Sequence, residues 1–141
     1  MKIIMLIVIG FSSFSYATFY RNVAGVVVDE KTTLQWQDDT QVANTVDNYT
    51  WQRAMNQCKI LNYGGHSDWR LPNINELSSI TDYYHSTPSI NATFQNTLTE
   101  DYWTSTGNKS NQREAWYINF SEGFSNTHTK TSLKYVRCVR N

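Results

Sequence analysis

Apolar residues recur at helical spacing in the first half of the chain. Between positions 51 and 61 they stand three, four and three residues apart, which places them on one face of a helix. We expect this helix to begin after Thr50, a good N-cap. It is expected to end at Tyr63-Gly64-Gly65, because glycine enters positive φ without steric cost. The apolar face consists of Trp51, Ala54, Cys58 and Leu61.

A short extended link and a second helix are predicted next. Pro72 pushes Leu71 into an extended conformation. Asn73, with Glu76 three residues later, makes the Asn-x-x-Glu form of a capping box, so a helix should begin here. The helix is expected to end before Pro88. Its apolar positions, three to four residues apart, are Ile74, Leu77, Ile80 and Tyr84.

Alternating and β-branched segments predict strands toward both ends of the chain. Trp116, Ile118 and Phe120 are expected on one face of their strand. The last strand is expected to pair with the N-terminal hairpin, which gives an α+β fold with two helices and an antiparallel sheet. Residues 37–47 should form an exposed polar loop, and residues 89–100 a long loop pinned by single apolar side chains. The predicted strands cover residues 26–28, 33–36, 101–106, 115–120 and 135–140, with a further short one near 124–129.

The first 17 residues have the features of a secretory signal peptide. A basic start at Lys2 is followed by an apolar run over residues 3–11 and by Ser15-Tyr16-Ala17, so cleavage is expected after Ala17. The apolar run is too short to span a bilayer comfortably. We therefore expect an exported protein, located in the periplasm, at the cell surface or outside the cell. Residues 18–141 then form a single domain.

The charge of the chain is nearly balanced. The full sequence holds 12 Lys+Arg and 12 Asp+Glu, and removal of Lys2 leaves 11 against 12, a net charge of −1. This balance gives no reason to expect a nucleic acid or an anionic membrane as partner. The two cysteines, Cys58 and Cys138, are expected to form a disulfide, because exported chains keep paired cysteines oxidised. A reactive free thiol is the alternative.

Six sequence motifs, in order along the chain, resemble the C-terminal domain of the Legionella collagen-like adhesin. The resemblance covers nearly all of the chain after residue 17. The motifs are Val28-Asp29…Leu34-Gln35-Trp36-Gln37, Trp51-x-x-Ala54-x-x-x-Cys58-x-x-Leu61, Asp68-Trp69-Arg70-Leu71-Pro72-Asn73-x-x-Glu76-Leu77, Tyr102-Trp103-Thr104-Ser105-Thr106, Ala115-Trp116-Tyr117-x-Asn119-Phe120 and Tyr135-Val136-Arg137-Cys138-Val139-Arg140.

This resemblance implies a fold of the C-type-lectin-like type. In that fold a cysteine on the first helix pairs with one on the last strand, in agreement with the expected pairing of Cys58 and Cys138. The Arg-Leu-Pro-x-x-x-Glu stretch and the terminal Arg-Cys-Val are also similar to the formylglycine-generating enzymes, which share the broad fold. The adhesin implies polyanionic host sugars as one class of ligand. The present chain lacks collagen-like repeats.

Signatures of catalysis and of metal binding are missing from the sequence. His66, His85 and His128 are isolated, and no calcium-loop pattern occurs. The calcium-binding triplets of the calcium-dependent lectins are also absent. No nucleophile elbow or phosphate-binding glycine loop is present. We expect no catalytic residues, no metal and no cofactor, and interpret the protein as a non-enzyme.

The charged residues on the link between the helices have two interpretations. They are either a polar site or, as we favour, a structural motif in which Glu76 caps its helix while Asp68 and Arg70 satisfy buried groups or each other. The whole motif comprises Asp68, Trp69, Arg70, Pro72, Asn73 and Glu76.

Candidate ligand-binding residues lie on loops and near the C-terminus. Tyr83 and Tyr84, with the Asn- and Thr-rich loop Ser86–Asn96, are surface candidates, because polar loops on a rigid scaffold commonly carry binding. Most tryptophans are expected in the core. A basic strip for an acidic ligand, or alternatively a solvated strand face, is formed by Lys130, Lys134, Arg137 and Arg140.

These observations predict an exported, non-catalytic binding module at the bacterial cell envelope. Its ligand would be a carbohydrate, a polyanionic glycan or an envelope protein, contacted through loops between Ser86 and Asn111. Two alternatives are a structural or assembly subunit, as of a pilus or the envelope, and an enzyme built on a scaffold like that of the formylglycine-generating enzymes.

Overall fold

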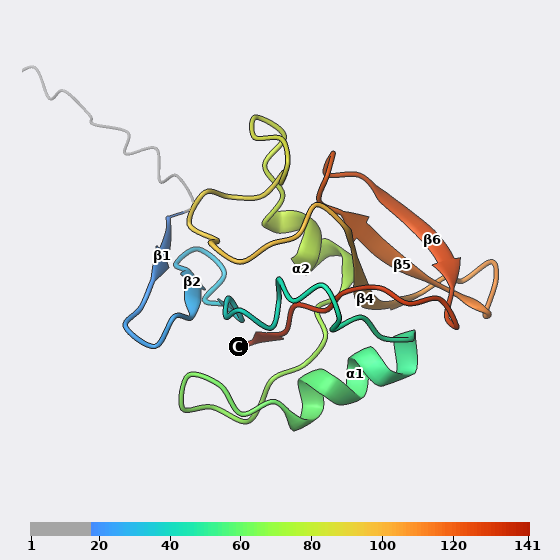
Figure 1. Ribbon diagram of the computed structural model, residues 1–141, viewed down its shortest axis with the longest axis horizontal. Helices are drawn as coiled ribbons and strands as arrows, with labels where there is room; N and C mark the ends of the chain where they lie inside the picture. The colour runs from blue at the N-terminus through green and yellow to red at the C-terminus, as the bar shows by residue number, and fades with distance from the viewer. Residues whose placement is uncertain (1–17) are drawn as a thin grey trace, which may run out of the picture.

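The computed structural model describes residues 18–141, which fold into two small antiparallel sheets and two helices (Figure 1). The predicted signal peptide, residues 1–17, lies outside the described residues. The order of elements confirms the predicted α+β class. The elements are β1 (Phe19–Arg21), β2 (Val27–Asp29), β3 (Gln35–Trp36), α1 (Trp51–Ile60), α2 (Ile74–Ser79), β4 (Asp101–Gly107), β5 (Glu114–Asn119), β6 (Ser125–Thr129) and β7 (Val139–Arg140).

The first sheet joins the two ends of the described chain. Its strand order is β1-β2-β3-β7, with all neighbours antiparallel. Trp36 is opposite Val27 on one side and Val139 on the other, and all three side chains are fully buried. The predicted hairpin and its pairing with the last strand are therefore confirmed. Only residues 139–140 of the predicted last strand are in the sheet.

The second sheet, β4-β5-β6, packs against a helix on each face. Ile118 and Phe120 are buried in a cluster with residues of α2, as their predicted common face requires. Ala115 and Tyr117, on the opposite face, are buried in a cluster with residues of α1. Trp116 is only partly buried. Burial therefore does not follow a simple alternation in β5, because both faces of the strand are covered.

Helix α1 has the predicted position but not the predicted ends. Thr50 is its N-cap residue, yet its side chain makes no capping hydrogen bond. The helix ends at Ile60 and is followed by the extended C-cap residue Leu61, so the prediction that the glycines end it is wrong. Gly64 and Gly65, with φ of +62° and +80°, instead form a tight turn three residues later.

Helix α2 is shorter than predicted. The capping box is confirmed, because Asn73 accepts a hydrogen bond from the Glu76 N–H and Glu76 accepts one from the Asn73 N–H. The helix ends at Ser79, well before Pro88. Tyr84 lies beyond it and is fully exposed, so its assignment to the apolar face of the helix is wrong.

The disulfide between Cys58 and Cys138 is present and links α1 to the residue before β7. Both cysteines are buried in the cluster between α1 and the second sheet. This confirms the predicted link from the first helix to the end of the chain. The relation to the C-type-lectin-like fold stays a prediction from the resemblance. None of the helices within residues 18–141 has the length and hydrophobicity needed to cross a bilayer.

On the link between the helices, Asp68 and Arg70 each have an ion-pair partner, and the residue between them, Trp69, is buried. Arg70 donates two hydrogen bonds of 2.8 Å to the two carboxylate oxygens of Glu76. Asp68 accepts hydrogen bonds of 2.6 and 3.0 Å from Arg140 and does not pair with Arg70. Trp69 is buried, and its indole N–H donates to backbone carbonyls of the preceding turn. Each charged side chain of the motif thus has a structural partner.

Candidate functional site

A hollow beside the disulfide has a volume of about 150 Å³. Its lining comes from three segments: α1 with the residue after it, the loop between β3 and α1, and the segment that leads into β7. Its lining is mainly polar, with two apolar side chains. The lining residues are Gln37, Gln41, Asp47, Tyr49, Gln57, Leu61, Val136 and Cys138.

Asp38 holds the loop between β3 and α1 in place. Its side chain is fully buried and forms ion pairs with Arg21 and with Arg137. The same carboxylate accepts hydrogen bonds from the backbone N–H groups of Gln95 and Asn96, at 2.9 and 3.1 Å. One buried carboxylate therefore connects this loop to the long loop before β4 and to the end of the chain.

The expectation of an exposed loop over residues 37–47 is wrong for its anchored part. Gln37, Asp38 and Val42 are buried. The carbonyl oxygen of Val42 accepts a 2.8 Å hydrogen bond from the hydroxyl of the buried Tyr102. Gln41 remains exposed and lines the pocket, while its buried neighbours fix the backbone of the loop.

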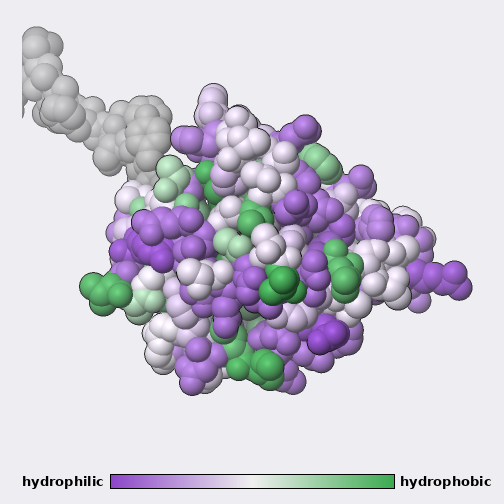
Figure 2. Space-filling model, viewed as in Figure 1, coloured by the Kyte–Doolittle hydropathy of each residue, from purple (hydrophilic) through white to green (hydrophobic). Residues whose placement is uncertain are grey.

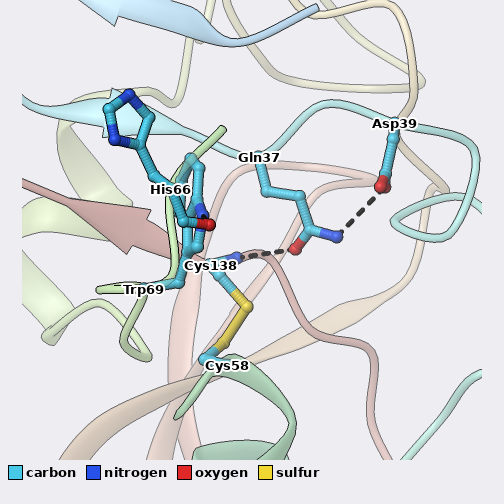
Figure 3. Close-up of a disulfide and its surroundings, with 6 residues drawn as sticks. All are labelled: Gln37, Asp39, Cys58, His66, Trp69 and Cys138. Atoms are coloured by element: carbon cyan, nitrogen blue, oxygen red, sulfur yellow. Dashed lines mark hydrogen bonds between the residues drawn. A yellow bond between two sulfur atoms is a disulfide. The ribbon is translucent and has the colours of Figure 1, made fainter. Parts of the chain in front are cut away.

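Gln37 lines the pocket beside Cys138, and both the oxygen and the nitrogen of its amide already have a hydrogen-bond partner. Its amide oxygen accepts a hydrogen bond of 3.2 Å from the Cys138 N–H, and its amide nitrogen donates one of 3.0 Å to Asp39 (Figure 3). Figure 3 shows this amide next to the disulfide, between Cys138 and Asp39. Gln37 therefore holds the backbone at Cys138 in place, and the other polar side chains of the lining are available to a ligand.

Those other side chains are neutral or acidic. Neither Gln41 nor Gln57 makes a side-chain hydrogen bond within residues 18–141, so both amides can bind a ligand. Burial raises the pKa of the Tyr49 phenol above its ordinary value of 10.0, and the Asp47 carboxylate raises that pKa further. Tyr49 therefore keeps its hydroxyl proton at neutral pH and can both donate and accept hydrogen bonds.

Tyr49 is also held firmly. Its backbone forms two hydrogen bonds with Lys134, and its carbonyl accepts a third, of 2.9 Å, from the indole N–H of Trp103. The guanidinium of Arg53 lies over its ring, 5.9 Å from the centroid. The aromatic wall of the pocket is thus preorganised.

The four basic residues predicted to form a strip are separately engaged. Lys134 pairs with Asp101, the fully buried Arg137 pairs with Asp38, and Arg140 pairs with Asp68. Lys130 donates to the carbonyl of Gln112 and lies over the Trp51 ring, 4.2 Å from its centroid. A continuous exposed strip does not form, and Arg137 has no surface to offer. A ligand role for Lys130, Lys134 and Arg140 stays a prediction.

Tyr83 and Tyr84 are exposed, as expected for surface candidates, but they do not line the pocket. Tyr83 packs on the turn between β5 and β6, where a Cβ added to Gly123 would lie 3.1 Å from the ring. The neighbouring predicted loop forms a second hollow of about 210 Å³. Its lining residues are His85, Ser86, Pro88, Ile90, Asn91, Ala92 and Phe94. Ligand binding at these tyrosines and this loop stays a prediction.

The sequence interpretation missed the pocket itself. None of the sequence motifs includes Gln41, Asp47, Tyr49 or Gln57. The one local sign that the loop before α1 is anchored is Val42, a single buried valine among polar residues.

Within the described residues, no group of three His, Cys, Asp or Glu side chains is placed to hold a metal ion. On the face shown in Figure 2, hydrophobic residues form separate spots among hydrophilic ones.

Comparison with known proteins identifies the family. A search of curated proteins finds no match. Residues 25–140 match the family model described as the Lcl C-terminal domain, a range that contains β2 to β7, both helices and the disulfide. This domain is associated with an adhesin and not with a known class of enzymes. The chain therefore belongs to the Lcl C-terminal domain family.

Proposed function

We propose that this chain is a non-catalytic binding module at the bacterial cell envelope and that its pocket beside the disulfide holds an uncharged carbohydrate. The observation that carries the proposal is the pair of glutamine amides, of Gln41 and Gln57, that line this pocket without a side-chain hydrogen bond within residues 18–141. The amides of Gln41 and Gln57 and the hydroxyl of Tyr49 match the donors and acceptors of sugar hydroxyl groups. Export of the chain is supported by the pattern of residues 1–17 and by the disulfide.

The apolar part of the pocket fits the same class of ligand. Leu61 and Val136 provide a surface for the C–H face of a sugar ring. The volume, about 150 Å³, is below the roughly 300–1,000 Å³ of sites for drug-sized ligands. A pocket of this size suits one sugar unit, such as the end of a glycan chain, and affinity for a single unit should be weak.

Charge decides between a neutral and a polyanionic ligand. The charged residue of the pocket lining is Asp47, a carboxylate, and it would repel a sulfated or acidic sugar. Three of the four cations predicted to attract a polyanion are already paired with carboxylates. Both observations favour an uncharged ligand at this site.

The test is a glycan array probed with the oxidised, exported protein, followed by titration of the best neutral glycan against two matched variants. Gln57→Ala removes a pocket amide from α1, whereas Gln52→Ala removes an exposed amide from the same helix outside the pocket. We expect Gln57→Ala to weaken binding about tenfold, equivalent to one lost hydrogen bond of about 1.4 kcal/mol. Gln52→Ala should bind like the wild type.

Three results would overturn the proposal. Equal glycan affinity of the wild type and Gln57→Ala would remove the pocket from the interaction. Salt-sensitive retention on heparin, unchanged in Gln57→Ala and without affinity for any neutral glycan, would instead support a polyanionic ligand. Copurification of a stoichiometric envelope protein in place of glycan binding would support the assembly-subunit alternative.

A further inference from the structure

Lys134, Asp101 and Asn119 meet where the segment before β7 crosses the ends of β4 and β5. The Lys134 ammonium donates a 2.7 Å hydrogen bond to Oδ2 of Asp101. The Asn119 side-chain nitrogen donates one, also of 2.7 Å, to Oδ1 of the same carboxylate. One carboxylate therefore holds a primary amine and a carboxamide next to each other.

The amine is shielded from water. The Lys134 side chain is only 6% exposed, which is unusual for lysine. Its nitrogen lies over two aromatic rings, 3.9 Å from the Tyr117 centroid and 5.2 Å from that of Trp103. The limited contact of this ammonium with water strengthens its electrostatic interaction with Asp101, whose own side chain is 29% exposed.

The backbone fixes all three residues. Asp101 and Asn119 are directly opposite each other in the β4–β5 ladder. The carbonyl oxygen of Asp101 accepts a 2.9 Å hydrogen bond from the N–H of Tyr135, the residue after Lys134. Lys134 itself exchanges two backbone hydrogen bonds with Tyr49. This anchoring keeps the amine and the carboxamide beside the same carboxylate and so raises their effective concentration toward each other.

We propose that Lys134 and Asn119 become joined by an isopeptide bond, with Asp101 transferring the protons. Asp101 takes a proton from Lys134 Nζ, and the resulting amine attacks Cγ of Asn119 to form the new C–N bond. Asp101 delivers this proton to Nδ2 of Asn119, the old C–N bond breaks, and ammonia leaves. Asp101 then accepts the second proton of the attacking nitrogen, which leaves a neutral amide, and passes that proton to the released ammonia as ammonium. The step needs no oxidant, reductant or further reactant, and it leaves a second covalent link in addition to the disulfide.

The test is the mass of the exported protein after reduction and alkylation of its cysteines. Loss of ammonia makes the wild type about 17 Da lighter than its sequence requires. Trypsin should release residues 114–130 joined to residues 131–137, because the modified Lys134 is no longer cleaved. Fragmentation of this pair should place the link between Asn119 and Lys134.

Three variants separate the cross-link from other losses of ammonia. Lys134→Arg keeps the charge but removes the amine, Asp101→Asn removes the proton carrier, and both should have the full calculated mass. Lys130→Arg changes a neighbouring lysine outside the triad and should remain about 17 Da light. The mass can be measured whether or not a variant is stable. A folded, disulfide-bonded wild type of full mass, or a deficit that persists in Lys134→Arg, would overturn the proposal.

Discussion

Replacement of Asp38 by alanine should be among the most damaging single changes to this protein. The Asp38 and Arg137 side chains are both fully buried and lie 3.0 Å apart. Removal of one partner from a buried ion pair costs about 3–5 kcal/mol, because the other charge is left without compensation. The N–H groups of Gln95 and Asn96 also lose their acceptor, at about 1–3 kcal/mol for each group that stays buried.

These contributions overlap, so we expect Asp38→Ala to lower the free energy of unfolding by about 4–6 kcal/mol. A domain of this size is stable by about 5–15 kcal/mol, so the variant should be close to unfolded. The assay is urea unfolding at neutral pH with the disulfide intact, followed by tryptophan fluorescence. Asp68→Ala, which removes the exposed partner of Arg140, is the matched control and should unfold almost like the wild type. A loss of no more than about 1 kcal/mol in Asp38→Ala would refute this account of the buried carboxylate.

Three further predictions concern the link, the disulfide and the turn after α1. Hydrogen bonds from Arg70, above all, hold the pKa of Glu76 below its ordinary value of 4.5, so the folded state binds this proton more weakly than the unfolded chain. The stability that the Arg70–Glu76 pair contributes should be present above pH 4.5 and be lost as the pH falls below this value. A difference in urea midpoint between the wild type and Glu76→Gln that stays constant from pH 7 to about 3 would contradict this prediction. The Cys58→Ala, Cys138→Ala double variant should lose about 4 kcal/mol, since the bridge closes a separation of 80 residues, and a reductant should lower the urea midpoint of the wild type toward that of the variant. Gly64→Ala should destabilise more than Gly65→Ala, because both have positive φ but only at Gly64 would the new Cβ lie 2.6 Å from Val26; equal urea midpoints would show that the turn relaxes.

Local signals in the sequence predicted those parts of the fold that depend on near neighbours. The capping box at Asn73 and Glu76 was recognisable because its partners are three residues apart. The N-terminal hairpin was recognisable from its β-branched and alternating segments. The disulfide is the long-range exception, because two cysteines allow only one pairing.

Polar residues with distant partners were misread from the sequence. Asp38 resembles any loop aspartate, yet its partners lie 57, 58 and 99 residues away along the chain. Arg137 looked like part of a basic strip for the same reason, and the pocket beside the disulfide was missed because its walls come from three separate segments. Sequence patterns indicate which apolar residues are buried, but they do not indicate which distant charged residues are buried with them.

The disulfide also determines how the module responds to mechanical tension. If Phe19 and Arg140 were pulled apart, the force would pass through the disulfide from Cys58 in α1 to Cys138. The chain between the two cysteines would not carry this force. The 80-residue separation corresponds to about 260–290 Å of extended chain that stretching cannot release while the bridge is intact. Under such a load, α2 and the second sheet would stay folded even after the strands of the first sheet had separated.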